Sequence, residues 1–122
     1  MDVLDASALM AVINGELGQE IVAPRLSRAA ISAVNLSEVA AKLSERGYPV
    51  AKASEFLLAF NLDVRPFDTD QALAAAALRV VTRDRGLSFG DRACLALAAS
   101  LGGVALTADR AWAGLDGVEL IR

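Results

Sequence analysis

The sequence contains no histidine, and this absence limits the chemistry that the chain can perform. Without an imidazole there is no serine–histidine–aspartate relay and no histidine acid/base pair. A catalyst built from this sequence therefore depends on carboxylates, hydroxyls, arginine or a bound cation. Cysteine is nearly absent as well, since Cys94 is the only one, which excludes an internal disulfide and a multi-cysteine zinc site. Its neighbours Ala93 and Leu95 predict a small buried residue, to which we assign no chemical role.

Long apolar runs are also missing. No stretch approaches the roughly 18 apolar residues of a membrane span. The segment from Met1 to Asp5 begins as a strand, where a signal peptide would carry a basic leader. We therefore expect a cytoplasmic protein with no membrane partner. Its 122 residues predict one domain, residues 1–122, that is large enough to bury a core.

The charge balance limits the function further. The net charge of −3 argues against a protein that coats nucleic acid nonspecifically. Arginine is nevertheless concentrated at Arg79, Arg83, Arg85 and Arg92, within fourteen positions. Because Asp84 lies among these arginines, we interpret them as a solvated helix face rather than a phosphate-binding patch.

Short β-rich runs alternate with longer alanine- and leucine-rich helical runs along the whole chain. The predicted strands are residues 2–4, 30–34, 62–65, 104–107 and 118–121. The predicted helices are residues 6–13, 17–26, 36–46, 50–60, 69–83 and 89–101, with a short last one near Arg110. This alternation predicts an α/β fold in which helices cover both faces of a five-stranded, mainly parallel sheet.

Four acids stand at or just inside the start of a predicted helix: Asp5, Glu38, Asp91 and Asp109. Each has a structural explanation, because Asp5 and Asp109 occupy N-cap positions, and Glu38 and Asp91 follow Asn35 and Ser88 at capping-box spacing. If the strands are parallel, however, all four acids lie at the carboxyl edge of the sheet, where α/β proteins place their ligands.

Four carboxylates in one crevice need a compensating charge. At about 7 Å and an effective dielectric of about 20, each of six pairs repels by roughly 2.4 kcal/mol, which outweighs four caps of about 1 kcal/mol each. Protonation of one or two acids is one remedy, and a hard divalent cation such as Mg²⁺ or Mn²⁺ is the other. We favour the cation.

Ser7 and Thr107 lie two residues from Asp5 and Asp109, so their hydroxyls either bond these carboxylates or cap locally. Asp68 and Asp70, before a long helix, are interpreted as caps.

The acids lie in four sequence segments that together are specific. They read VLDASALMAVING around Asp5, ISAVNLSEVAAKL around Glu38, LSFGDRACLALAASLG around Asp91 and ALTADRAW around Asp109. In order and rough spacing these segments resemble the PIN-domain ribonucleases, most closely the VapC toxins of bacterial toxin–antitoxin pairs. The resemblance spans nearly the full length. It implies a three-layer α/β/α sandwich with strand order 3-2-1-4-5.

The resemblance also implies a function and the residues that carry it. The four acids would be the metal-site residues, and Thr107 the hydroxyl beside the last of them. The implied reaction is metal-dependent cleavage of an RNA phosphodiester, with Mg²⁺ or Mn²⁺ as cofactor and a cation-bound water attacking phosphorus. Arg92 and Arg110, each next to a site aspartate, are candidates for substrate phosphate contacts or for salt bridges. The implied partners are RNA, a cognate antitoxin and a second toxin copy in a homodimer.

Two other functions fit parts of the pattern. A phosphate-accepting receiver domain has an acidic pocket at the same edge, but it needs a late lysine, and the only lysines are Lys42 and Lys52. A metal-dependent adhesion module would begin a DxSxS loop at Asp5, but Leu9 occupies the second serine position. An inactive scaffold of the same fold is disfavoured because all four acids are present.

Overall fold

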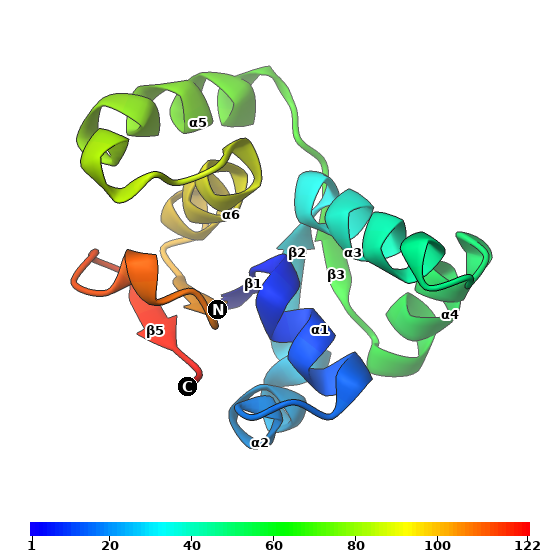
Figure 1. Cartoon of the computed structure of the whole chain (residues 1–122). Helices are drawn as coiled ribbons and strands as arrows, with labels where there is room; N and C mark the ends of the chain where they lie inside the picture. Colours follow the sequence, from blue (N-terminus) through cyan, green and yellow to red (C-terminus); the bar gives the residue numbers. More distant parts are fainter.

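The sheet places five parallel strands in the order β3-β2-β1-β4-β5, as the resemblance implied. The computed structural model describes all residues, 1–122 (Figure 1). The strands are β1 (Asp2–Leu4), β2 (Ala29–Ser32), β3 (Asp63–Arg65), β4 (Val104–Thr107) and β5 (Val118–Leu120). Four of the five lie within one residue of their predicted bounds, and the second begins one residue earlier and ends two residues earlier than predicted.

Helices follow the strands in sequence. They are α1 (Ala6–Asn14), α2 (Gln19–Val22), α3 (Ala33–Glu45), α4 (Ala51–Phe60), α5 (Thr69–Val81) and α6 (Phe89–Ser100). Three short 3₁₀ helices are η1 (Ala23–Arg28), η2 (Arg83–Arg85) and η3 (Arg110–Trp112). None of these helices has the length and apolar character that crossing a membrane requires.

Two apolar clusters cover the two faces of the sheet. Successive strand residues point to opposite faces, so Leu4 packs with α1, α2, α3 and α4 on one face, while Val3 packs with α6 and Trp112 on the other. Trp112 is fully buried, and so is Cys94, whose thiol has a pKa raised well above its ordinary value by burial. The result is the predicted three-layer α/β/α sandwich, and Cys94 is the buried residue that its neighbours predicted (Figure 1).

The predicted second strand, 30–34, and the following helix, 36–46, are wrong at their junction. Strand β2 ends at Ser32, whose hydroxyl accepts the Val34 N–H at 3.2 Å and thereby caps α3. Ala33 and Val34 are therefore helical. The apolar run AAISAV resembles a strand throughout, but a serine cap can end a strand inside such a run.

The predicted helix 17–26 is also wrong. The chain instead forms the short α2 and then η1, with Pro24 in the first turn of η1. Gly18 precedes α2 with a φ of 102°, and a Cβ added there would lie 2.7 Å from the Ile121 carbonyl oxygen. The close approach of the C-terminal segment and the positive φ at Gly18 explain why one continuous helix does not form.

The sheet topology brings distant segments together at one edge. Strands β1 and β4 are neighbours, with Leu4 opposite Leu106, and the Asp5 N–H donates to the Leu106 carbonyl at 3.0 Å. Asp5 therefore follows β1 beside Thr107, the last residue of β4. The amino ends of α3 and α6 lie at this same edge, because both helices run antiparallel to the strands (Figure 1).

Candidate metal and active site

Asp5 is the central acid of the site and is almost fully buried, with 5% of its surface exposed. It occupies the N-cap position of α1, yet its carboxylate makes no cap hydrogen bond. Its Oδ2 instead accepts hydrogen bonds from Ser7 Oγ at 2.6 Å and Thr107 Oγ1 at 2.9 Å. The predicted N-cap role is therefore wrong for the Asp5 side chain. The expected bond from Ser7 is present, whereas Thr107, expected beside Asp109, donates to Asp5.

The two hydroxyls are themselves fixed by the backbone. Ser7 Oγ accepts the Ala108 N–H at 2.9 Å, and Thr107 Oγ1 accepts the Asp109 N–H at 3.0 Å. These four hydrogen bonds join the end of β1 to the end of β4. They fix the orientation of one carboxylate oxygen and leave Asp5 Oδ1 without a protein donor.

Asp91 and Asp109 do act as caps. Ser88 and Asp91 form a reciprocal capping box at the start of α6, in which Asp91 Oδ2 accepts the Ser88 N–H at 2.8 Å. Asp109 Oδ1 accepts the Ala111 N–H at 2.9 Å at the start of η3. Capping uses one oxygen of each carboxylate, so it is compatible with a second role for the other oxygen.

Glu38 is held by Asn35 in a way that the sequence did not indicate. Ser32 caps α3, so the predicted capping box between Asn35 and Glu38 is wrong. Asn35 is fully buried in the first turn of α3, and its Nδ2 donates both to Glu38 Oε1 at 3.1 Å and to the Gly90 carbonyl at 2.9 Å. A Cβ at Gly90 would lie 1.9 Å from Glu38 Oε1. Glycine at this position lets the Glu38 carboxylate lie against α6, next to Asp91.

All four carboxylates follow the same pattern. Each has one oxygen fixed by a hydroxyl, a backbone N–H or an amide, and its other oxygen receives no hydrogen bond from the protein. None of them pairs with an arginine or lysine, because the ion pairs of the chain all involve other acids. The site therefore presents oriented oxygens whose negative charge the protein leaves uncompensated.

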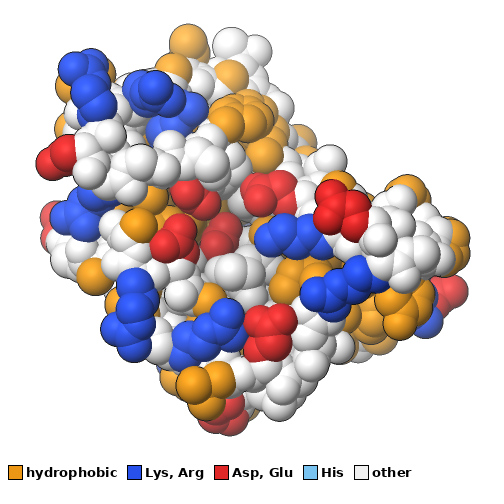
Figure 2. Space-filling model, in the orientation of Figure 1, with side chains coloured by type: hydrophobic (Ala, Val, Ile, Leu, Met, Phe, Trp, Pro, Cys, Tyr) orange, Lys and Arg blue, Asp and Glu red, His pale blue; other side chains and the backbone are white.

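The electrostatics show that the acids share one region. Burial, followed by the charge of Asp5 and then that of Asp91, raises the pKa of Glu38. Burial also raises the pKa of Asp91, as do the charges of Asp5 and Asp109, while its hydrogen bonds from Ser88 oppose this shift. Figure 2 shows acidic side chains gathered around a hollow in the middle of this face, with lysine and arginine side chains on the surrounding rim.

The donor set suits a hard divalent cation, although the carboxylates do not enclose one tightly. No three of them come close enough to hold one ion together as they stand. Mg²⁺ usually keeps several waters and is bound through only one or two carboxylates. Oxygen ligands with no histidine or cysteine among them are also what Mg²⁺ and Mn²⁺ prefer. Asp5, Glu38, Asp91 and Asp109 are the residues that would hold such an ion, partly through water.

Comparison with protein families decides the identity of the fold. The model of the PIN domain matches residues 3–118 of this chain. The chain is a PIN domain. Its relatives include the Mycobacterium tuberculosis protein named ribonuclease VapC42, which is 33% identical over 106 residues, covering 79% of this chain and 81% of the relative.

Solved structures resemble this PIN domain over almost their whole length. A toxin–antitoxin complex from Klebsiella pneumoniae superimposes with a TM-score of 0.80 at 19% identity, covering 100% of this chain and 98% of that one. DNA-bound VapBC from Salmonella typhimurium gives a TM-score of 0.73 at 22% identity, with coverage of 99% and 98%. VapBC-5 from Mycobacterium tuberculosis gives a TM-score of 0.60 at 27% identity, covering 99% of this chain and 97% of that one. The likenesses below 25% identity support the fold.

The two candidate arginines of this PIN domain differ in their surroundings. Arg92 Nη1 donates to the Ala75 carbonyl at 3.0 Å, and its guanidinium lies 5.9 Å from the centre of the Phe89 ring. Arg92 thus links α6 to α5, and neither it nor Arg110 forms the salt bridge considered as an alternative. Arg110 is exposed beside Asp109, and its side chain makes no hydrogen bond. Phosphate contact by either arginine stays a prediction.

Proposed function

We propose that this PIN domain is a metal-dependent endoribonuclease that cleaves RNA phosphodiester bonds, and that residues 1–122 form one nuclease domain. The observation that carries the proposal is the pattern of the four acids, each with one fixed and one free oxygen and none with a cationic partner. The relatives named as VapC ribonucleases support the same activity.

The chain's own residues would orient the reaction. Asp5, whose Oδ2 is held by Ser7 and Thr107, would present Oδ1 toward the ion, and Asp91 and Asp109 would present the oxygens that their caps leave free. Glu38 would complete the set from α3, positioned by Asn35. A bound Mg²⁺ or Mn²⁺ would supply an activated water and stabilise negative charge on the leaving oxygen.

We further propose that the chain is the toxin of a toxin–antitoxin pair. Several solved structures that share its fold are VapBC or toxin–antitoxin complexes. Its partners would be an RNA substrate, a cognate antitoxin and a second toxin copy in a homodimer. The apolar side chains that α5 exposes, among them Leu73 and Val80, are compatible with a protein interface. Neither the receiver nor the adhesion alternative gains support from the family match.

The first experiment is a cleavage assay with purified protein and a structured RNA. We expect cleavage with Mg²⁺ or Mn²⁺, none with EDTA, and a loss of at least about 100-fold in Asp5→Asn and Asp91→Asn. Asp84→Asn is the matched control, because Asp84 is an exposed aspartate of η2 outside the site. Cleavage that is equal in all three variants would mean that a contaminating nuclease cuts the RNA.

A second experiment tests the toxin role. Induced expression in a bacterial host should stop growth and produce one recurrent RNA end in sequencing, and Asp91→Asn should do neither. Co-expression of a cognate antitoxin should restore growth. Growth arrest by Asp91→Asn equal to that of the natural chain would contradict a toxicity that depends on cleavage.

A further inference from the structure

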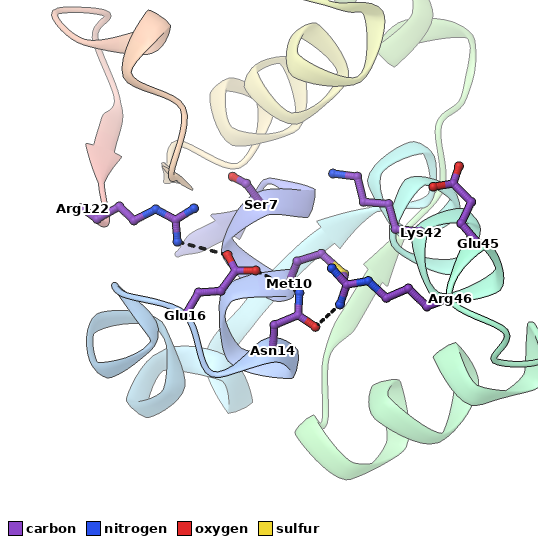
Figure 3. A pocket seen from close by; sticks show the side chains of 8 residues that line it. All are labelled: Ser7, Met10, Asn14, Glu16, Lys42, Glu45, Arg46 and Arg122. Carbon is purple, nitrogen blue, oxygen red and sulfur yellow. Dashed lines mark hydrogen bonds and ion pairs between the residues drawn. The ribbon is translucent and has the colours of Figure 1, made fainter.

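A polar groove of about 390 Å³ lies between α1 and α3 (Figure 3). Ser7 lines its upper end, and the same hydroxyl donates to Asp5. Its other lining residues are Met10, Asn14, Glu16, Lys42, Glu45, Arg46 and Arg122. Ser7 therefore borders both the groove and the carboxylate of Asp5.

Helical periodicity places cations along this groove. On α3 the residues Glu38, Lys42 and Arg46 follow at intervals of four, so they lie on one face of the helix. Glu38 belongs to the acidic site, and the charge of Lys42 acts on it by lowering its pKa against the stronger effect of burial. The order along the groove is thus an acid at the site, then a lysine, then an arginine.

A chain of hydrogen bonds fixes the two arginines on opposite sides of the groove. Arg46 Nη1 donates to Asn14 Oδ1 at 2.5 Å, and Asn14 Nδ2 donates to Glu16 Oε2 at 2.9 Å. Arg122 Nη1 then donates to Glu16 Oε1 at 3.1 Å and to the Leu17 carbonyl at 2.9 Å. Each arginine keeps further N–H donors that no protein acceptor uses, because a guanidinium has five.

The charges of the groove are arranged to favour an anion. Lys42, Arg46 and Arg122 outnumber Glu16 and Glu45. Asn14 and Arg122 lower the pKa of Glu16, so this carboxylate stays ionised and is used in holding Arg122. Figure 3 shows Lys42 and Arg46 pointing across the groove, whereas the Glu45 carboxylate points away from Asn14 and Glu16. Lys42 forms no ion pair within the chain.

We propose that Lys42, Arg46 and Arg122 bind backbone phosphates of the RNA strand next to the bond that is cut. This inference rests on the proposed function and extends it to the substrate track. A site with four acids and a chain with a net charge of −3 repel RNA, so cations adjoining the site are needed to hold the strand. The bidentate geometry of arginine suits phosphate, and the Asn14–Glu16 link holds both guanidiniums in place.

The test measures RNA binding apart from cleavage. Anisotropy of a labelled single-stranded RNA is followed in EDTA over a series of NaCl concentrations. Each phosphate neutralised contributes about 0.7 to the slope of log affinity against log salt for a single strand. We expect Lys42→Ala to reduce the slope by about 0.7 and the triple alanine variant with Arg46 and Arg122 by about 2. Arg83→Ala, an exposed arginine of η2, should leave the slope unchanged.

Two further variants control for folding. Arg46→Lys and Arg122→Lys keep the positive charge and should keep most of the slope. The side chain of Lys42 is exposed and forms no hydrogen bond or ion pair within the chain. Lys42→Ala therefore tests the proposal even if an arginine variant is poorly folded.

The possible outcomes separate the two proposals. Slopes that fall as expected in a chain that cuts no RNA would support the groove and contradict the nuclease activity. In a chain that does cut RNA, unchanged slopes or no measurable RNA binding would overturn the groove alone. Unchanged slopes combined with weaker binding of an antitoxin would overturn it in favour of an acidic protein segment as the occupant.

Discussion

Replacement of Asp91 by asparagine should stabilise the protein in the absence of metal. The substitution removes the ionisable carboxyl group of Asp91. Burial and the negative charges of Asp5 and Asp109 raise the pKa of this group, so its ionised form is disfavoured in the folded protein. The asparagine Oδ1 can still accept the Ser88 N–H in the capping box. The variant therefore separates the electrostatic cost of the site from its structural role.

The magnitude follows from the like-charge pairs. Two charges roughly 8 Å apart repel by about 2 kcal/mol at an effective dielectric of about 20. Asp91 is partly exposed, so with salt present we take about 1 kcal/mol for each of its two neighbours, Asp5 and Asp109. Loss of a negative charge in the first turn of α6 costs up to about 1 kcal/mol. The net gain is about 1 kcal/mol, or about 4 °C in Tm for a domain of this size.

Thermal unfolding followed by circular dichroism gives the measurement. In EDTA the Asp91→Asn variant should melt about 4 °C above the natural chain. With Mg²⁺ or Mn²⁺ the order should reverse, because a ligand at a hundredfold excess over its Kd stabilises the natural chain by about 2.7 kcal/mol and the variant by less. Asp84→Asn should change the stability by less than about 0.5 kcal/mol in both conditions. A variant that is less stable than the natural chain in EDTA would refute the repulsion on which the reasoning depends.

Three further changes test how the site is held. Gly90→Ala should keep the stability of α6 or raise it by up to about 1 kcal/mol. It should nevertheless lower RNA cleavage at least about tenfold, because the new Cβ would lie 1.9 Å from Glu38 Oε1 and displace that carboxylate. Asn35→Ala should weaken Mn²⁺ affinity, measured calorimetrically, by about tenfold, because it frees Glu38 and removes the hydrogen bond between Asn35 and the Gly90 carbonyl. Unchanged affinity would reduce Asn35 to a packing residue. In EDTA, Glu38→Gln should gain stability over the natural chain as the pH rises. The folded pKa of Glu38 is raised above 4.5, so its protonated form favours folding at low pH and that contribution is lost as the pH rises through the folded value. A gap between the two urea midpoints that does not widen with pH would contradict this.

The sequence was sufficient to predict the fold class and the strands, because alternating apolar runs and glycine punctuation report burial directly. The strand order could not be predicted in this way, because no local sequence pattern encodes it. It came from the family resemblance. The β2–α3 junction was misplaced because AAISAV is apolar on both sides of its serine cap. The predicted helix 17–26 is instead split into α2 and η1, and this depends on the contact between Gly18 and Ile121, which lie far apart in sequence.

The sequence placed the four acids at one edge of the sheet, but it did not indicate how most of them are held. The bond between Ser7 and Asp5 agrees with the prediction from their spacing. Thr107 was expected beside Asp109 but donates to Asp5, because the neighbouring parallel strands β1 and β4 end at one edge. The role of Asn35 was missed because its spacing from Glu38 is typical of a capping box, and its second bond, to Gly90, joins two helices. The Arg46–Asn14–Glu16–Arg122 chain was likewise hidden, since the C-terminal residue reaches α1 only in the folded protein.

The most direct measurement is a crystal structure of the chain soaked in Mn²⁺, with the ion located by its anomalous scattering. We predict one or two peaks within direct or water-mediated reach of Asp5, Glu38, Asp91 and Asp109, on the oxygens that the protein leaves free. The peaks should be absent or weakened in Asp91→Asn crystals. Full occupancy at another place on the surface, with no density among these carboxylates, would contradict the central claim.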